Sequence, residues 1–266
     1  MALITMLTDF GLKDGNVGVM KGVILNIAPA TRIVDLSHTI SAQNVHEAAL
    51  VLLRSAPYFP DGSIHLVVVD PGVGTDRRAI AAQLGAHYFV GPDNGVITML
   101  LDAVTQHSPE TRFVHLDKPQ YWLPEVSSVF HGRDIFAPCA AHLAAGVPLE
   151  KLGTAITAPI GLEIPAPQEL DRGWLGEVIH IDHFGNISSN IRLEHLGEHR
   201  QVLVMLGGTE IQGLVRTFGE RPAGELVTLF GSTGNLIVSV VNGSAAERLG
   251  TVVGDPIEVL LWTGRH

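Results

Sequence analysis

The feature that most constrains the fold is an alternation, in the first half of the chain, of short apolar runs with longer amphipathic stretches. The first three apolar runs are Leu3 to Leu7, Arg32 to Leu36 and Ile64 to Val69. Between them, Val17 to Ile27 and Val45 to Ser55 carry apolar residues at three-to-four spacing, which is typical of helices. Buried strands that alternate with helices predict a parallel, Rossmann-like sheet in an α/β domain, with helices on both faces.

The second half of the chain has a different pattern. Further helices are expected from about Val96 to Ala103 and from Asp134 to Ala145, and the prolines Pro165 and Pro167 follow. Beyond them, short β-rich runs are separated by glycine-rich turns, which predicts a small antiparallel β-barrel. These runs are Leu175 to Ile181, Val202 to Leu206, Leu226 to Phe230, Leu236 to Val241 and Ile257 to Trp262.

The change of pattern suggests where the domains meet. It falls near Ala158-Pro159-Ile160-Gly161, and proline and glycine so close together are typical of a connecting segment. We therefore predict an N-terminal α/β domain over residues 1–160, a linker over 161–172 and a C-terminal β-barrel domain over 173–266.

Charge and cysteine content narrow the classes of function. The 266 residues include 17 basic and 27 acidic side chains, for a formal net charge of −10. Because nucleic-acid binding needs a concentrated basic face, this balance argues against a nucleic-acid partner. The single cysteine, Cys139, excludes an intramolecular disulfide, and its apolar surroundings predict a buried core residue rather than a nucleophile. No apolar run is long enough to cross a bilayer and Met1 to Leu7 lacks the basic flank of a signal peptide, so we expect a cytoplasmic protein with no membrane partner.

Polar residues gather where the predicted strands end. Asp9 follows the first strand, Asp35 to His38 end the second, and Asp70 follows the third. The carboxyl ends of parallel strands share one edge of the sheet, and ligands bind at that edge in open α/β folds. These clusters therefore predict a ligand site there.

Two further polar clusters have simpler explanations. Gly91-Pro92-Asp93-Asn94-Gly95 is good turn chemistry and requires no function. In His131-Gly132-Arg133-Asp134, the aspartate precedes a predicted helix, so we interpret Asp134 as its N-cap. Both clusters remain candidates for the site, because they add to those at the strand ends.

The residues alone leave the chemistry open. No Gly-x-Gly-x-x-Gly follows the first strand, and the sequence holds no Walker loop. The stretch His195 to His199 has the spacing of a zinc-peptidase motif, but Gly197 in its middle favours a solvated turn. Asp9, Asp70 and Asp93 are compatible with a metal-dependent phosphatase. From its pattern alone, the chain is a hydrolase-like α/β enzyme.

A series of short motifs carries a resemblance to a known family. In the N-terminal half they are Thr8-Asp9-Phe10-Gly11, Met20-Lys21-Gly22, Val34-Asp35-Leu36-Ser37-His38, Val68-Val69-Asp70-Pro71-Gly72-Val73-Gly74-Thr75, Arg77-Arg78, Gly91-Pro92-Asp93-Asn94-Gly95 and Phe130-His131-Gly132-Arg133-Asp134-Ile135-Phe136-Ala137-Pro138. The C-terminal half adds Ile181-Asp182-His183-Phe184-Gly185-Asn186 and Gly243-Ser244-Ala245-Ala246. Each motif is short, but their joint order is specific and covers nearly the whole chain. The sequence resembles the S-adenosylmethionine hydroxide adenosyltransferase family, which is related to the fluorinase and chlorinase enzymes.

The resemblance implies a fold, an assembly and a catalytic set. It implies an α/β domain followed by a β-barrel, and a homotrimer with active sites at the subunit interfaces. It also implies an Asp-Arg-His set, which falls here on Asp70, Arg77 and His131, with Arg78 as the rival arginine. In the halogenases the aspartate position is occupied by another residue, so Asp70 favours hydrolysis over halide transfer.

The resemblance also implies how the substrate is held. S-adenosyl-L-methionine is itself the substrate, so no cofactor and no metal are expected. Asp9 resembles the residue that binds both ribose hydroxyls, a task that suits two carboxylate oxygens. The other expected contacts are Asp14 and Asn16 in the loop near the methionine end, Asp182 at the methionine ammonium, Asn186 at the adenine and Ser232 near the methionine carboxylate. The halogenases place tryptophans against the nucleoside, whereas Gln43 and Ser188 stand at the corresponding positions here.

The expected reaction splits the substrate into adenosine and L-methionine. The sulfonium leaves as a neutral thioether, so the reaction needs no general acid, only a water aligned behind C5′. Asp70 would orient that water and Arg77 would hold Asp70, while His131, alone or through Asp70, would take the proton. Besides the metal-dependent phosphatase, two alternative hypotheses remain. One is a halide-using transferase, and the other is a sensor that binds S-adenosylmethionine without turnover.

Overall fold

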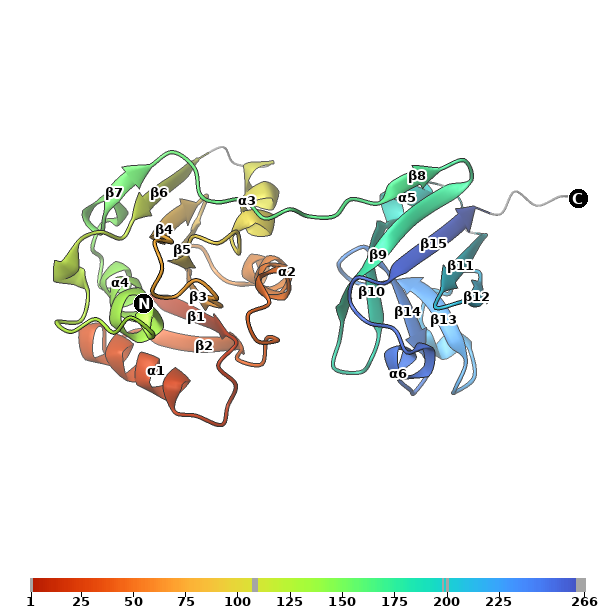
Figure 1. Ribbon diagram of the computed structural model, residues 1–266, viewed down its shortest axis with the longest axis horizontal. Coiled ribbons are helices and arrows are strands. Elements are labelled where there is room, and N and C mark those ends of the chain that lie inside the picture. The colour runs from red at the N-terminus through yellow and green to blue at the C-terminus, as the bar shows by residue number, and fades with distance from the viewer. Residues whose placement is uncertain (1, 107–109, 198, 200, 262–266) are drawn as a thin grey trace, which may run out of the picture. The chain divides into compact units, whose positions relative to one another are not determined.

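The computed structural model describes residues 2–106, 110–197, 199 and 201–261. Contacts within the chain divide it into two compact units, one ending at Leu162 and the other beginning at Glu163. The first is a mixed α/β unit and the second is almost entirely β (Figure 1). The predicted fold class, an α/β domain followed by a barrel, is confirmed.

The first unit is built on a seven-stranded sheet in the order β2-β1-β3-β5-β4-β6-β7. The parallel strands are β2 (Arg32–Ser37), β1 (Leu3–Thr8), β3 (Ile64–Val68) and β5 (His87–Pro92). The remaining strands add antiparallel to this set, and they are β4 (Ala79–Leu84), β6 (Thr111–His115) and β7 (Thr154–Ile156). The sheet is therefore parallel in one half only. The reason is local, because the turn at Gly85 between β4 and β5 is too short for the helical crossover that parallel strands require.

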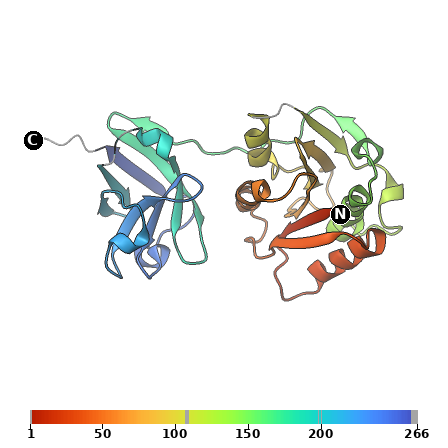
Figure 2. The same cartoon turned by 180° about the vertical axis from the view of Figure 1, so that it is seen from behind.

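Helices cover both faces of this sheet (Figures 1 and 2). On one face lie α1 (Asn16–Ile27) and α4 (Ala137–Ala144), and on the other lie α2 (Val45–Ser55) and α3 (Thr98–Thr105). Neighbouring residues of β1 show how the two cores form, since Met6 packs with α1 and α4 while Leu7 packs with α2 and α3. Alternate side chains of a strand point to opposite faces, so an uninterrupted apolar run is what a strand between two helical layers needs. Short helical turns lie at η1 (Ala56–Tyr58), η2 (Pro119–Tyr121) and η4 (Leu149–Lys151).

One predicted helix begins differently from the expectation. A π-helical turn, η3 (Gly132–Phe136), precedes α4. Asp134 lies inside this turn, fully buried, so its interpretation as an N-cap was wrong. Its carboxylate instead accepts the backbone N–H of Ser127 at 2.8 Å and the guanidinium of Arg133 at 2.6 Å. The buried charge is thus satisfied by Ser127 from the segment before the turn and by Arg133 within the turn.

The second unit is an antiparallel, barrel-like sheet in the order β12-β11-β15-β9-β10-β14-β13. Its strands are β9 (Gly173–Ile181), β10 (Ile187–Arg192), β11 (Val202–Leu206), β12 (Thr209–Gln212), β13 (Leu226–Phe230), β14 (Asn235–Val240) and β15 (Pro256–Leu261). The two end strands, β12 and β13, lie against each other, so the sheet nearly closes. A further strand, β8 (Gln168–Leu170), lies in the segment predicted as linker and pairs with β9. The helical segments of this unit are α5 (Leu193–Leu196), η5 (Phe218–Glu220) and α6 (Ala245–Leu249).

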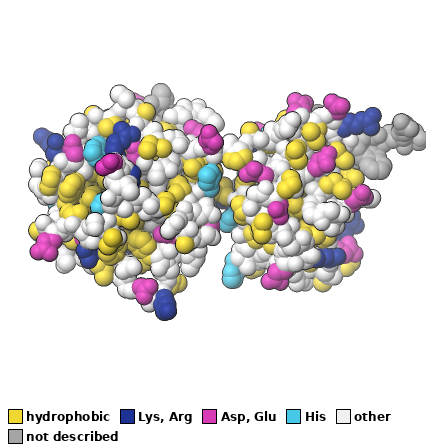
Figure 3. Space-filling view, in the orientation of Figure 1, with side chains coloured by type: hydrophobic (Ala, Val, Ile, Leu, Met, Phe, Trp, Pro, Cys, Tyr) yellow, Lys and Arg dark blue, Asp and Glu magenta, His cyan; other side chains and the backbone are white. Residues whose placement is uncertain are grey.

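The surface agrees with the acidic composition. On the face shown in Figure 3, Lys and Arg side chains are scattered among acidic ones and do not form one basic patch. Among the described residues, no helix has both the length and the apolar character that a membrane span requires.

Candidate active site

Asp70, Arg77 and His131 meet at the carboxyl edge of the parallel strands. Asp70 follows β3, Arg77 stands just before β4, and His131 precedes η3. The guanidinium of Arg77 donates to both carboxylate oxygens of Asp70, from Nε at 2.8 Å and from Nη2 at 2.5 Å. The same Nη2 lies 2.9 Å from Nδ1 of His131. Three side chains predicted from three separate motifs therefore form one hydrogen-bonded cluster.

The cluster is shielded from solvent. The side chains of Asp70 and Arg77 are only 6% and 8% exposed. The Arg77 guanidinium also lies 5.1 Å from the centre of the Phe136 ring, which gives the cation a favourable aromatic contact. A paired charge in such surroundings is screened less by water and salt than one at the surface. The bidentate contact consequently fixes the orientation of the Asp70 carboxylate.

The neighbouring arginine serves another carboxylate. Arg78 donates from Nε to Asp93 at 2.7 Å and from Nη2 to the carbonyl of Ala158 at 3.1 Å. Asp93 is buried and also accepts the backbone N–H of Ile160 at 2.7 Å. The structure thus brings Arg77, and not Arg78, to Asp70, while Arg78 ties the segment at 158–160 to the end of β5.

The contact with Arg77 determines the hydrogen-bonding role of His131. A guanidinium has donors and no acceptor, so Nδ1 of His131 must accept, and a neutral ring then carries its proton on Nε2. Burial lowers the pKa of His131 and the adjacent Arg77 cation lowers it further, against opposing effects of Asp70 and Asp134. The neutral ring is therefore favoured near pH 7, and it presents an N–H group at Nε2.

The loop that joins Asp70 to Arg77 is folded tightly. Its backbone makes turns from Val73 N–H to Asp70 and from Thr75 N–H to Gly72. Gly74 has a φ of +78°, and a Cβ atom there would lie 2.4 Å from the carbonyl oxygen of Ser128. Glycine is required at this position for both reasons. The backbone of this loop therefore packs directly against the segment that leads to His131.

The predicted ribose ligand, Asp9, lies at the same edge of the sheet, just beyond β1. Its Oδ2 accepts the backbone N–H of Gln43 at 2.8 Å. Gln43 has a φ of +64°, which is uncommon for a residue other than glycine. Asp14 and Asn16 are both exposed, and Asn16 is the first residue of α1 rather than part of the preceding loop.

Asp182 and Asn186 come together in the second unit. They flank the turn between β9 and β10, where Asp182 accepts the backbone N–H groups of Phe184 and Asn186 at 2.9 Å each and the side-chain amide of Asn186 at 2.8 Å. Gly185 completes the turn with a φ of +79°. The backbone N–H groups of Ala245 and Ala246 donate to the Gly185 carbonyl, which places the start of α6 against this turn.

Ser232 is not brought to this turn. It is exposed between β13 and β14, where the Gly234 carbonyl accepts the N–H of Leu193 beyond the far end of β10. Strand β10 spans Ile187–Arg192, and at about 3.3 Å per residue it separates the two turns by roughly 16 Å. The serine that packs against Gly185 is Ser244. The motif Gly243-Ser244-Ala245-Ala246 was recognised in the sequence, but its packing against the turn at Gly185 was not predicted.

The structure also places the other residues that the sequence singled out. Ser188 is buried on β10. Cys139 is also buried, as predicted, and burial raises the pKa of its thiol to about 12. Of the zinc-peptidase spacing, His195 lies on α5 and Gly197 follows with a φ of +54°, while residue 198 lies outside the described residues. Among the residues that the structure describes, no three His, Cys, Asp or Glu side chains are grouped as metal ligands.

Comparison with known proteins decides the family. A model described as the SAM hydroxide adenosyltransferase N-terminal domain matches residues 4–153, and its C-terminal counterpart matches residues 176–258. The chain belongs to the SAM hydroxide adenosyltransferase family. The Asp70-Arg77-His131 cluster and Asp9 fall within the first of the matched ranges, and the Asp182-to-Asn186 turn falls within the second.

Named relatives and a solved structure resemble this chain over most of its length. A protein of Thermus thermophilus named (R)-S-adenosyl-L-methionine hydrolase is 42% identical, over 98% of this chain and all of the relative. A protein of Nocardia brasiliensis named fluorinase is 28% identical, over 73% of this chain and 74% of the relative. Among solved structures, an uncharacterized conserved protein from Thermotoga maritima superposes with a TM-score of 0.88 at 37% identity, over 97% of this chain and 99% of the other.

Proposed function

We propose that this protein is an (R)-S-adenosyl-L-methionine hydrolase that forms adenosine and L-methionine. The observation that carries the proposal is the Asp70-Arg77-His131 cluster, in a chain 42% identical to a relative with that name. The prefix in that name specifies one configuration at the sulfonium sulfur, and we propose the same preference here. The reaction consumes no cofactor in this proposal, because the S-adenosyl compound is the substrate.

The chemistry asks little of the protein beyond position and charge. The oxygen of water attacks C5′ of the ribose from the side opposite the sulfur, the C5′–S bond breaks, and its electron pair stays on sulfur as the methionine thioether. Holding the water in line behind C5′ replaces an encounter in solution by an oriented one. Since the leaving group departs neutral, no side chain has to protonate it.

We assign the proton of the attacking water to Asp70. As the C–O bond forms, the water becomes strongly acidic, so an ionised carboxylate is a sufficient base. Arg77 occupies one lone pair on each Asp70 oxygen, and a carboxylate oxygen has a second one for the water. The sequence had left open whether His131 takes this proton. Its Nδ1 faces Arg77, which supports a different role, donation of a hydrogen bond from Nε2 to the oxygen of the attacking water.

The substrate contacts are proposals that follow the family resemblance. We propose that Asp9 binds the two ribose hydroxyls, and that Asp14 and Asn16 lie near the methionine end. Asp182 would pair with the methionine ammonium and Asn186 would contact the adenine. The proposed role of Ser232 at the methionine carboxylate is a separate prediction, because its turn and that of Asp182 lie at opposite ends of β10.

The assembly is also a proposal. The proposed ligands divide between the two units, with Asp9 in the first and Asp182 in the second. We propose a homotrimer whose active sites lie at subunit interfaces, so that each site is completed by an adjacent chain, as heterologous cyclic interfaces allow. A cytoplasmic location stays a prediction. Light scattering during turnover tests the assembly, and an active monomer would refute it.

Product analysis tests the function directly. The purified protein is incubated with the R and the S sulfonium epimers separately, in ¹⁸O-labelled water, and the products are separated by chromatography and weighed by mass spectrometry. We expect adenosine labelled at its 5′-hydroxyl, together with methionine, from the R epimer. The matched control is Asp70→Asn, which keeps the size of the side chain and should lose turnover while retaining binding.

Other outcomes would select the alternatives. Binding of the R epimer without adenosine would indicate a sensor. Turnover that requires a halide and yields a 5′-halogenated nucleoside would indicate a transferase. Turnover that chelators abolish would indicate a metal-dependent hydrolase. Homocysteine as a product, or adenosine without the label, would overturn direct attack of water at C5′.

A further inference from the structure

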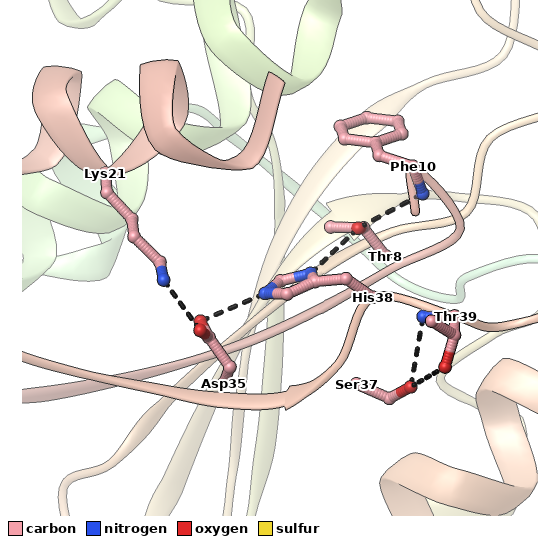
Figure 4. Close-up of polar contacts among 7 residues, drawn as sticks. All are labelled: Thr8, Phe10, Lys21, Asp35, Ser37, His38 and Thr39. Atoms are coloured by element: carbon pink, nitrogen blue, oxygen red, sulfur yellow. Dashed lines mark hydrogen bonds and ion pairs between the residues drawn. The ribbon is translucent and has the colours of Figure 1, made fainter. Parts of the chain in front are cut away.

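A buried histidine outside the catalytic cluster holds the turn that carries Asp9. His38 follows β2 and is only 4% exposed. Figure 4 shows its two ring nitrogens between two partners, with Nδ1 2.9 Å from Thr8 Oγ1 and Nε2 3.0 Å from Oδ1 of Asp35. Lys21, on α1, donates to the other oxygen of Asp35 at 2.6 Å. These four side chains form a continuous polar chain from α1 to the end of β1.

The charged end of this chain of contacts determines which nitrogen of His38 carries the proton. Burial raises the pKa of Asp35, but the contacts from Lys21 and His38 outweigh that effect and lower it. The carboxylate is therefore ionised near pH 7 and faces a protonated Nε2 on His38. In the neutral ring Nδ1 then accepts, so the hydroxyl of Thr8 donates to it. The same hydroxyl oxygen accepts the backbone N–H of Phe10 at 3.3 Å.

His38 also holds the turn through its backbone. Its carbonyl oxygen accepts the N–H of Gly11 at 2.7 Å, where the chain has a φ of +69°. One residue thus fastens the turn at Thr8 through its side chain and at Gly11 through its main chain. Asp9 lies between these two points.

The same turn contacts the neighbourhood of His131. The ring of Phe10 packs edge to face on Phe130, with 5.7 Å between ring centres. Phe130 directly precedes His131 in the chain. A displacement of the turn would therefore reach Asp9 first and His131 only through an aromatic contact.

From these contacts we infer that His38 is a positioning residue: by holding the turn from Thr8 to Gly11, it orients Asp9 for the substrate. The inference rests on the proposed role of Asp9 in substrate binding. In metal sites, residues that orient a ligating group without touching the metal change affinity or activity by about 10- to 100-fold when they are altered, and we expect an effect at the low end of that range here.

The fold supplies a matched control on the same strand. Thr5, three residues before Thr8 on β1, is also fully buried and also contacts a histidine, with Oγ1 2.8 Å from Nδ1 of His65. Thr5→Val and Thr8→Val each remove one buried hydroxyl that contacts an imidazole. Only the second of these hydroxyls is connected to the turn that carries Asp9.

The experiment compares the two variants in steady-state kinetics with the R sulfonium epimer. For Thr8→Val we expect KM and the inhibition constant of adenosine to rise on the order of 10-fold, with kcat within about threefold, because the nucleophile cluster is untouched. For Thr5→Val we expect both constants within about twofold of wild type, at a comparable loss of thermal stability. His38→Asn keeps an acceptor near the Nδ1 position and should retain more affinity than His38→Ala. Equal KM values in the two valine variants would overturn the inference and leave the proposed function intact.

A second measurement does not depend on turnover. Amide hydrogen exchange reports the hydrogen bonds that the turn makes through the N–H groups of Phe10 and Gly11. We expect Thr8→Val to lose protection at both amides, whereas Thr5→Val retains it. Unchanged protection in Thr8→Val would overturn the inference. A wild-type protein that forms no adenosine would instead refute the proposed function, and the exchange result would still decide whether His38 holds the turn.

Discussion

Replacing Arg77 by lysine separates charge from geometry in the candidate active site. Lysine keeps the positive charge, but its ammonium is a point donor and cannot reproduce a planar fork that reaches both Asp70 oxygens and Nδ1 of His131 at once. The change therefore removes two of three charge-assisted contacts. Because the Arg77 and Asp70 side chains are 8% and 6% exposed, we use the free energies of buried hydrogen bonds to charged groups and not the smaller ones of surface ion pairs.

The size of the effect follows from these contacts. Two hydrogen bonds to charged groups, taken near the low end at about 1.5 kcal/mol each, amount to about 3 kcal/mol. A loss of that size in the transition state lowers kcat/KM by roughly 10²-fold. Adenosine release, measured by chromatography at saturating and at low substrate, should place most of the loss in kcat, since the cluster acts on water.

Arg78→Lys is the control for this prediction. It makes the same substitution one residue along the chain, at an arginine whose partners are Asp93 and the carbonyl of Ala158. We expect it to lower the melting temperature while leaving kcat within a few-fold of wild type. If the two lysine variants lose kcat equally, or if Arg77→Lys is nearly as active as wild type, the geometric argument for Arg77 is wrong.

Three further predictions use the titratable groups. Burial, followed by the charge of His87, lowers the pKa of His65 to about 4, so its neutral form favours the native state. This shift contributes about 3 kcal/mol to the free energy of unfolding, complete above pH 6.5 and lost as the pH falls toward 4. Urea unfolding at several pH values should show this loss in the wild type and a smaller one in His65→Asn. Cys139, whose thiol has a pKa of about 12, should resist iodoacetamide in the native protein and react only after unfolding, and rapid native alkylation would contradict its burial. The lowered pKa of His131 predicts that kcat falls in acid with a midpoint below pH 6.5, so a fall centred at 6.5 or above would contradict it.

The sequence was most informative where one local pattern determines one structure. The helix predicted over Val45 to Ser55 is α2 with the same bounds, because its apolar spacing and its Asn44 cap agree. Strand ends were equally informative. The apolar runs that precede Asp9 and Asp70 were enough to predict that both residues lie at one edge of the sheet, and the structure has both there.

Other features depend on partners that are distant in sequence. The strand pair β4 and β5 is a local hairpin, but its residues are buried in continuous runs between the outer neighbours β3 and β6, so no alternating pattern predicted it. Spacing alone did not separate Arg77 from Arg78. It also did not reveal that the buried carboxylate of Asp134 would be satisfied by Ser127, seven residues earlier.

The barrel shows the same limit. The family resemblance indicated Ser232 as a substrate contact, and this role stays a prediction; its turn and the turn at Asp182 lie at opposite ends of β10. Strand pairing brought Ser244 to the second turn instead. Registers between antiparallel strands fix which turns share an end of a barrel, and the pattern of one strand does not contain that information.

The adjacent arginines before β4 have a consequence for how this protein can change over evolution. Loops usually tolerate insertions and deletions, but successive residues of extended chain point to opposite sides. Losing a single residue between Asp70 and Arg77 would bring Arg78 to Asp70 and leave Asp93 without an arginine, whereas gaining one would bring Arg77 to Asp93 and leave Asp70 without one. The deletion would also leave the Ala158 carbonyl without its arginine contact, in the segment by which the chain leaves the first unit. We therefore expect this surface loop to keep its length and its Gly74 while its other residues vary.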